Sequence, residues 1–318
     1  MYRDKRIALV IPAYNERKLI KPTLKSVPKE FDRIFVVDDC SIDDQCDVII
    51  GCANNDNRIQ LINHKTNQGP GGAIITGYLQ ASKENYDITV VVGGDNQMPL
   101  NEFEKFLDPI IDGEVDYTKG NRFLLGKIED TLDKMPRTRL MGNWLITSLT
   151  KIASGYYKAM DVVDGYTAIS KKAIDTVNWE NAWKHYGYPM DFLIRLNAYG
   201  FKIKDIPRTA IYLPGERQSQ IKGLNYAMKV SPMLLRNFLW RLKFKYIYID
   251  FHPLVFFYYL SFILLPIGFF TGFILIVNQF ILLKGVSGPQ ATFCALMIIM
   301  GFQSLLFAML FDMEVSDK

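Results

Sequence analysis

Residues 7–16 read IALVIPAYNE. The run Ile7–Ile11 is wholly apolar and rich in β-branched residues, which is typical of a strand buried on both faces of a sheet. A proline and the polar residues Tyr14, Asn15 and Glu16 follow it directly. The glycine pattern of a dinucleotide-binding domain, GxGxxG, is missing here. The stretch therefore predicts the first strand of an α/β sheet, with a polar loop at its end.

Two more strands and three helices follow outward from this first strand. Ile34–Asp38 and Ile88–Val92 are rich in Val and Ile and are predicted to be buried strands. Glu16–Val27, Asp43–Ala53 and Gly72–Lys83 are predicted helices between them. This alternation indicates βαβ units and a mostly parallel sheet. Because ligands bind at strand ends in such sheets, function is sought in the segment after each strand.

Acids follow the second strand, in the stretch Asp38-Asp39-Cys40-Ser41-Ile42-Asp43. A carboxylate at a strand end can accept hydrogen bonds from a nucleobase N–H or a ribose hydroxyl. We expect Ser41 and Asp43 to cap the next helix. Asp38 and Asp39 are harder to explain as caps and are candidates for ligand binding.

Glycines and a third acid come next. The glycines of Asn67–Ala73 fit either a backbone that approaches an anion closely or a plain turn. After the third strand, Gly93-Gly94-Asp95-Asn96-Gln97 offers a carboxylate and amide oxygens, which suit a hard divalent cation. We expect Mg²⁺ or Mn²⁺ here, bridging to a diphosphate. A P-loop is excluded because no GxxxxGK[ST] motif occurs.

Charge is uneven along the 318 residues, whose net charge is only +4. Between Lys222 and Ile249 the chain carries basic residues and no acid, and Leu234, Leu235, Phe238, Leu239 and Leu242 recur at helical spacing. Ser231-Pro232 predicts the start of this helix. We interpret it as an amphipathic helix on an anionic membrane surface rather than as a nucleic-acid site. A solvated helix or one packed on the core remains an alternative.

Two apolar stretches close the chain. Leu254–Val277 and Ala291–Phe311 are each long enough to cross a bilayer core of roughly 30 Å. Lys284–Gln290 is a short connection, so the two spans are predicted to form an antiparallel hairpin. The basic residues before the first span place the soluble part on the cytoplasmic side of the cell membrane. A hairpin buried in a soluble protein is the alternative.

The ordered set of motifs resembles glycosyltransferase family 2, whose fold is called GT-A. Pro12–Glu16, Asp38–Asp43, Asn67–Ala73 and Asp95–Gln97 occur in the family's order, each after a strand or before a helix. With the C-terminal spans, the whole chain is similar to the dolichyl- or polyprenyl-phosphate sugar synthases. The resemblance implies a Rossmann-like GT-A domain at 1–221, amphipathic juxtamembrane helices at 222–250, and transmembrane helices at 254–283 and 291–311.

The resemblance also implies roles for individual residues. Gly93 replaces the first acid of the family's Asp-x-Asp motif, so the metal would rest on Asp95 and Gln97. Asp191 lies where relatives carry an acid at a helix start, and fits a base, a metal contact or a helix-dipole partner. Arginines suit phosphates because the guanidinium is planar and always charged. The implied catalytic residues are Asp95, Arg122, Arg139 and Asp191, and the implied nucleotide-sugar site comprises Pro12, Tyr14, Asn15, Glu16, Val37, Asp39, Asn67, Asp95, Asn96 and Arg122.

The implied reaction is inverting transfer of a sugar from a nucleotide sugar to dolichyl or polyprenyl phosphate. A UDP-sugar is favoured over a GDP-sugar. The phosphate nucleophile is already anionic near neutral pH, so a general base is hardly needed. A membrane glycosyltransferase acting on a sugar hydroxyl is the first alternative, and a non-catalytic membrane scaffold is the second. The sequence leaves the oligomeric state open, a homo-oligomer included.

Overall fold

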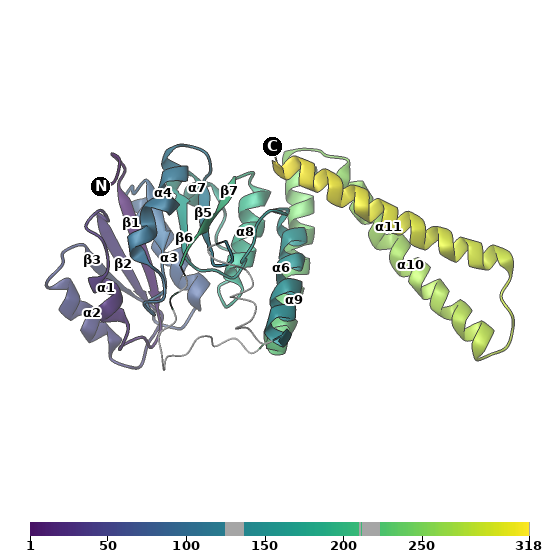
Figure 1. Cartoon of the computed structure of the whole chain (residues 1–318), viewed down its shortest axis with the longest axis horizontal. Helices are drawn as coiled ribbons and strands as arrows, with labels where there is room; N and C mark the ends of the chain where they lie inside the picture. Colours follow the sequence, from purple (N-terminus) through teal and green to yellow (C-terminus); the bar gives the residue numbers. More distant parts are fainter. Residues whose placement is uncertain (125–136, 210, 212–222, 318) are drawn as a thin grey trace. The chain divides into compact units, whose positions relative to one another are not determined.

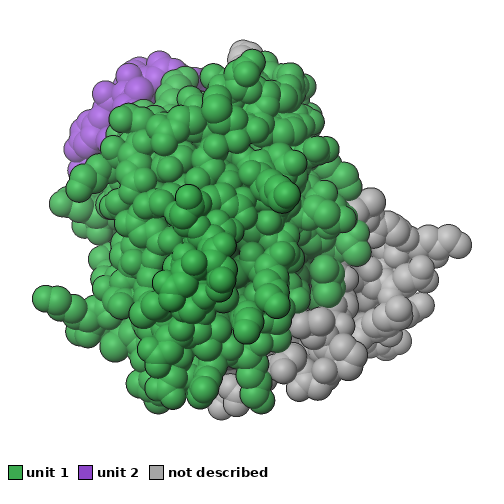
Figure 2. Space-filling view, turned by 90° about the vertical axis from the view of Figure 1, so that its left-hand side faces the viewer, with its two compact units in different colours: residues 1–154, 158–238 green, residues 155–157, 239–318 purple. Residues whose placement is uncertain are grey.

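The computed structural model describes residues 1–124, 137–209, 211 and 223–317 (Figure 1). They form two compact units, which are coloured separately in Figure 2. The first unit comprises Met1–Ser154 and Lys158–Phe238, and the second comprises Gly155–Tyr157 and Leu239–Lys318. The sheet lies in the first unit and the long apolar helices lie in the second.

The first unit is built on a seven-stranded sheet with the order β3-β2-β1-β4-β6-β5-β7 (Figure 1). β1 pairs in parallel with β2 and β4, and β2 pairs in parallel with β3. β6 runs antiparallel to β4 and β5, while β7 is parallel to β5. The predicted mostly parallel sheet is therefore confirmed. The strands are β1 (Ile7–Ala13), β2 (Arg33–Asp38), β3 (Ile59–Asn63), β4 (Ile88–Val91), β5 (Tyr117–Asn121), β6 (Thr167–Ser170) and β7 (Ile203–Pro207).

Helices cover both faces of the sheet because its strands are apolar on both sides. Leu9 and Ile11 of β1 share a core with residues of α1, α2 and α4. Val10 points to the other face, where α3 lies so close that a Cβ on Gly77 would come within 2.3 Å of it. The helices are α1 (Ile20–Lys25), α2 (Gln45–Ala53), α3 (Pro70–Lys83), α4 (Phe103–Ile111) after the short turn η1 (Leu100–Glu102), α6 (Arg137–Ser154), α7 (Lys171–Thr176), α8 (Tyr188–Ala198) and α9 (Gly223–Lys243).

Helix α9 begins earlier than the sequence predicts. Ser231 and Pro232 lie inside it, so the prediction that they start a helix is wrong. A proline removes one helical hydrogen bond. Buried neighbours compensate: Val230 and Met233 pack over Gly187, at 3.1 and 3.6 Å from the position of an added Cβ. Tertiary packing thus keeps the chain helical on both sides of the proline.

The second unit is an antiparallel hairpin of α10 (Leu254–Phe280) and α11 (Gly288–Asp317), preceded by the π-helical turn η2 (Phe244–Ile249). Both helices are long and apolar enough to cross a membrane. Only 11% of the apolar 18-residue stretch of α10 is buried, and only 22% of that of α11. Glycines let them approach closely: a Cβ on Gly268 would lie 2.7 Å from Ile298, and one on Gly301 would lie 2.8 Å from Leu265. The predicted pair of apolar helices is confirmed.

A buried polar cluster closes the open end of the hairpin. Asp312, near the end of α11, is fully buried and accepts hydrogen bonds from Arg241 Nη1 at 3.0 Å and Nη2 at 2.6 Å. The hydroxyls of Tyr246 and Tyr258 donate to it at 2.5 and 3.3 Å. These bonds join the end of α11 to η2 and to the start of α10.

Candidate active site

Polar segments gather at one edge of the sheet because the strands end there. β1, β2 and β4 are mutually parallel, so their carboxyl ends share this edge. β5 has the direction of β4, because β6 is antiparallel to both, and β7 follows β5. Ligands of open α/β sheets bind at such an edge. It collects the segments that start at Pro12, Asp38, Val92, Arg122 and Arg208, and the segment Asp161–Tyr166 that enters β6.

The loop after β1 is held by side chains from the loop after β2. Ser41 Oγ accepts the N–H of Asn15 at 3.0 Å, and Asp43 Oδ2 accepts the N–H of Arg17 at 2.9 Å. The prediction that Ser41 caps α2 is therefore wrong, whereas Asp43 Oδ1 does accept the N–H of Gln45, the first residue of α2, at 3.4 Å. The N-cap residue is Asp44, which makes no side-chain cap bond. The two loops thus form one fixed surface.

The predicted nucleoside-binding residues after β1 lie on this surface. Tyr14 is 43% exposed, and Pro12 is half-buried at the end of the strand. Glu16 is also half-buried, and its N–H donates to Gln45 Oε1 at 2.7 Å. Val37 is fully buried within β2, so its side chain faces the core. Of this set, Tyr14 presents the most accessible ring for a base to contact.

Asp39 is only 3% exposed and organises the loop that precedes α3. Its carboxylate accepts the N–H groups of Gln68 at 2.8 Å and Gly69 at 2.7 Å, and His64 Nδ1 lies 2.8 Å from Oδ1. Asn67 Nδ2 donates to the carbonyl of Asp39 at 3.1 Å. We call residues 67–72 the glycine loop. Asp39 holds this loop in place, and a role for Asp39 or Asn67 in binding a nucleoside stays a prediction.

The glycine loop also lies directly against residues 178–187. An added Cβ on Gly69 would lie 2.6 Å from the carbonyl oxygen of Lys184, and one on Gly71 would lie 2.7 Å from that of Trp183. The N–H of Gly72 donates to the Lys184 oxygen at 3.2 Å. The glycines are therefore needed for close packing between two backbone segments. These contacts favour the turn interpretation over the anion-binding one.

Asp95 and Gln97, the predicted metal ligands, lie in the loop after β4. The N–H of Gln97 donates to Asp95 Oδ1 at 3.2 Å, and both residues are half-buried, as is Asn96 between them. Burial raises the pKa of the Asp95 carboxyl. Among the described residues no three His, Cys, Asp or Glu side chains gather around a common point. One carboxylate and one amide oxygen fit Mg²⁺, which takes its other ligands from substrate phosphates and water.

An ion-pair cluster lies at the ends of β5 and β7. Arg122 makes a two-pronged contact with Asp161, from Nε to Oδ2 and from Nη2 to Oδ1, both at 2.7 Å. Asp164 pairs with Arg208 at 2.7 Å and lies 3.4 Å from Arg122 Nε. Sequence reasoning missed Arg208, although a basic residue directly after the segment Ile203–Pro207 was a usable signal. The side chain of Arg122 is 27% exposed, so one side of the cluster reaches the surface.

Asp191 lies in the first turn of α8 and is fully buried. Oδ2 accepts the N–H of Trp183 at 2.7 Å and Nε of Arg195 at 2.9 Å, and Oδ1 accepts Nδ2 of Asn237 at 2.5 Å. Of the three roles considered for Asp191, these contacts favour a structural one at the helix start. The side chain of Arg139 lies outside the described residues.

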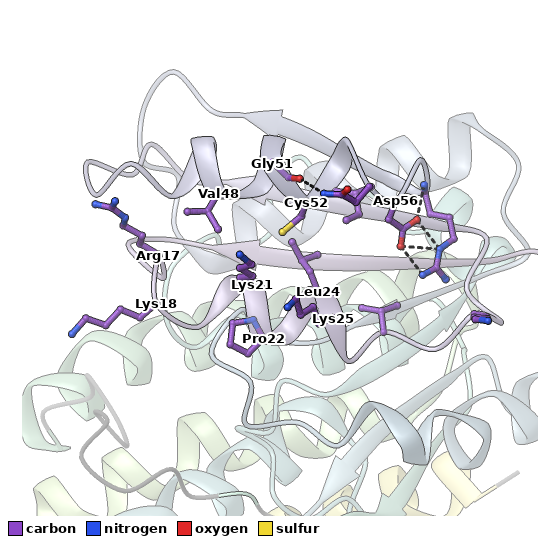
Figure 3. A pocket seen from close by; sticks show the side chains of 15 residues that line it. Arg17, Lys18, Lys21, Pro22, Leu24, Lys25, Val48, Gly51, Cys52 and Asp56 are labelled. Atoms are coloured by element: carbon purple, nitrogen blue, oxygen red, sulfur yellow. Dashed lines mark hydrogen bonds and ion pairs between the residues drawn. The ribbon is translucent and has the colours of Figure 1, made fainter.

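A separate cleft of about 1090 Å³ lies between α1 and α2 (Figure 3). Lysines line it, including Lys21 and Lys25, together with apolar residues that include Leu24 and Val48. None of the residues predicted for the site lines this cleft. The strand-end edge remains the candidate active site.

The glycosyltransferase family 2 model matches residues 8–177, which include β1 to β6 and the loops just described. This chain belongs to glycosyltransferase family 2. A dolichyl-phosphate N-acetylglucosaminyltransferase of Methanococcus voltae, whose name specifies UDP-N-acetylglucosamine, is 32% identical over 235 residues, or 70% of this chain and 91% of the relative. An undecaprenyl-phosphate mannosyltransferase of Micrococcus luteus is 27% identical over 212 residues, or 65% and 84%.

Solved structures of other glycosyltransferases share the fold. Glucosyl-3-phosphoglycerate synthase from Mycobacterium tuberculosis, in complex with UDP, has a TM-score of 0.53 at 18% identity, covering 75% of this chain and 80% of that one. A second structure of that enzyme contains Mn²⁺ and UDP, with a TM-score of 0.50 at 16% identity and the same coverage. At this identity the likeness establishes the GT-A architecture of this family 2 domain.

Proposed function

We propose that this family 2 glycosyltransferase moves a sugar from a UDP-sugar to a polyprenyl phosphate, dolichyl or undecaprenyl. The observation that carries the proposal has two parts. Asp95 and Gln97 lie at the same edge of the sheet as the Arg122–Asp161 ion pair, and the same chain has two apolar helices. Two relatives named for lipid-phosphate acceptors support it, and the one named for UDP-N-acetylglucosamine favours a uridine donor.

A phosphate acceptor suits this site better than a sugar hydroxyl. A phosphate monoester is largely ionised near neutral pH, with a second pKa of about 6, so it can attack without a general base. Asp191, the residue considered as a base, is fully buried and bonded to three donors. The main barrier is then the repulsion between the acceptor phosphate and the donor diphosphate. Cationic groups at the site reduce that repulsion.

In this proposal Asp95 and Gln97 hold Mg²⁺ or Mn²⁺, which supplies positive charge to the leaving diphosphate. Arg122, which follows the end of β5 at the same edge of the sheet, binds a phosphate through its guanidinium in this proposal. Its pairing with Asp161 keeps the guanidinium oriented until an anion competes for the same donors. Inversion at the anomeric carbon follows if the acceptor oxygen attacks directly from the face opposite the leaving diphosphate.

The proposed location is the cell membrane, crossed twice, with the catalytic unit on the cytoplasmic side. The basic residues of α9 and η2, among them Lys229, Lys243 and Lys245, precede α10. Exposed apolar side chains accompany them, including Tyr248 and Phe251. This combination suits the interface of an anionic leaflet.

The deciding experiment is a donor panel with full-length protein in detergent. Polyprenyl phosphate, Mg²⁺ or Mn²⁺, and a set of UDP- and GDP-sugars are combined, and the lipid-phosphate-sugar product is measured. We expect product from a UDP-sugar, and a loss of about 100-fold or more in Asp95→Asn. Asp112→Asn, an exposed acid at the end of α4, is the matched control and keeps its activity. Transfer to a sugar hydroxyl, or no donor binding, contradicts the proposal.

A further inference from the structure

Helix α9 is connected to the glycine loop through a short series of buried contacts. The first residue of this series is Asn237 of α9, which is 4% exposed and donates through Nδ2 to Asp191 Oδ1. Val230, Met233 and Leu234 of the same helix are buried around it. Asn237 is therefore held firmly, and its position follows that of α9.

Asp191 connects Asn237 to residues 178–187. Its second carboxylate oxygen accepts the N–H of Trp183 and Nε of Arg195. Arg195 in turn donates to the carbonyl oxygens of Asn178 at 3.1 Å and of Asn181. The part of this segment from Asn178 to Trp183 is thus bonded to the side chains of the Asp191–Arg195 pair. A change at Asn237 alters the partners of the carboxylate that orients this segment.

The 178–187 segment meets the glycine loop without spare room. Lys184 accepts the N–H of Gly72, and an added Cβ at Gly69 or Gly71 would overlap the backbone of Trp183 or Lys184. The far side of the glycine loop is bonded to Asp39 at the end of β2. Since interfaces packed this closely deform little, a shift of one segment is transmitted to the next.

We propose that Asn237 and Asp191 are positioning residues that set the conformation of the glycine loop, and with it the affinity for the nucleotide sugar, according to how α9 is held. The second half of the inference rests on the proposed function, because it takes Asp39, which is bonded to the loop, to contact the nucleoside of the donor. α9 is suited to this task. Four residues after Asn237, Arg241 of the same helix is ion-paired with Asp312 of α11 within the second unit.

The test compares full-length Asn237→Leu with wild type, since leucine has a similar size and donates no hydrogen bond. Ser231→Leu is the matched control, because it introduces the same residue at an exposed position of the same helix. The first readout is amide hydrogen exchange in detergent. In Asn237→Leu we expect exchange of the 67–73 and 183–188 segments to rise about tenfold, while β1 and β4 stay protected. Ser231→Leu should match wild type.

The second readout is transfer kinetics over a range of donor concentrations. We expect the donor KM to rise about tenfold in Asn237→Leu with kcat within about twofold, because the loop positions Asp39, a residue predicted to bind the nucleoside, and does no chemistry. Asn237→Ser, which replaces the amide donor with a hydroxyl donor, should lie between wild type and Asn237→Leu and is the substitute if Asn237→Leu does not fold.

The outcomes separate this inference from the proposed function. Unchanged exchange in residues 67–73 overturns the linkage, whatever the protein transfers. Raised exchange with an unchanged donor KM overturns the role in donor binding. Raised exchange in a protein that transfers no sugar from any donor supports the linkage and contradicts the proposed function.

Discussion

At the level of single residues, the ion pair with Arg122 sets the pKa of Asp161 in the candidate site. Burial raises the pKa of Asp161, but the hydrogen bonds and charge of Arg122 outweigh it, and the net pKa lies below the usual range. The ordinary value in an unfolded chain is about 3.9. The ion pair therefore stabilises the fold above about pH 4, and this stabilisation is lost as pH falls through the lower, folded-state pKa.

A pH series tests this pair. We expect Asp161→Asn to lower the thermal midpoint of unfolding at pH 7, and the difference from wild type to narrow below about pH 4 as wild-type Asp161 becomes protonated. The measurement is thermal unfolding in detergent between pH 7 and 3. Asp112→Asn, at an exposed site, controls for the general effect of acid. A difference that stays constant over the whole range would contradict the expected linkage.

Arg208 leads to a second prediction at this scale. Its guanidinium pairs with Asp164, whose side chain is fully buried, and Nη1 lies 3.5 Å from the carbonyl oxygen of Gln97. Arg208→Met should leave this carboxylate with too little compensating charge and lower the free energy of unfolding by about 3 kcal/mol. Chemical denaturation measures it. Adding Asp164→Leu should restore part of the loss, and a double variant less stable than Arg208→Met would argue against the pair.

Among the secondary-structure elements, strands rich in apolar residues could be predicted from the sequence, and polar strands could not. β1, β2 and β4 are runs of Val, Ile and Leu, and the sequence predicted all three. β5, which reads YTKGN, carries no apolar pattern and was missed as a strand, although it is fully buried. It is held by pairing with β6 and β7, which no local signal reveals.

The same distinction applies to the candidate site. Strand-end motifs located Asp39 and Asp95, because parallel strands bring their ends to one edge, whereas Arg122 was located by the family resemblance. The hydrogen-bond and ion-pair partners at this edge were not predicted. His64, Asp161 and Arg208 come from segments far along the chain, and only the folded sheet brings them together.

The hairpin leads to a prediction about helix pairing. A Cβ placed on Gly272 of α10 would lie 3.2 Å from Cys294 Sγ of α11. A disulfide, with a Cβ–Cβ distance of about 3.8 Å, puts each Cβ roughly 3 Å from the partner sulfur. Gly272→Cys should therefore form a disulfide with Cys294 under mild oxidation, detected by mass spectrometry of the digested protein. Gly288→Cys, where nothing lies within 4 Å, should not. Failure of the first pair to cross-link would contradict this packing.

For the whole molecule, the hairpin determines which surfaces share a side of the membrane. Asp312 near the end of α11 is bonded to Tyr246 and Tyr258, which flank the start of α10. Both ends of the hairpin therefore lie together, and the connection between α10 and α11 lies at the other end. If the helices cross the bilayer, residues 281–287 are on the side opposite the ends.

Labelling from one side of the membrane tests this arrangement. In a variant whose four native cysteines are replaced, single cysteines are introduced as Ser287→Cys in the connection and Met313→Cys at the end of α11. In right-side-out vesicles, we expect an impermeant maleimide to label Ser287→Cys at once and Met313→Cys only after permeabilisation, because the basic residues before α10 keep the ends in the cytoplasm. Labelling of both without permeabilisation would mean that the hairpin lies along the surface, and the two-span topology would have to be abandoned. The reverse pattern would keep two spans and place the catalytic unit outside.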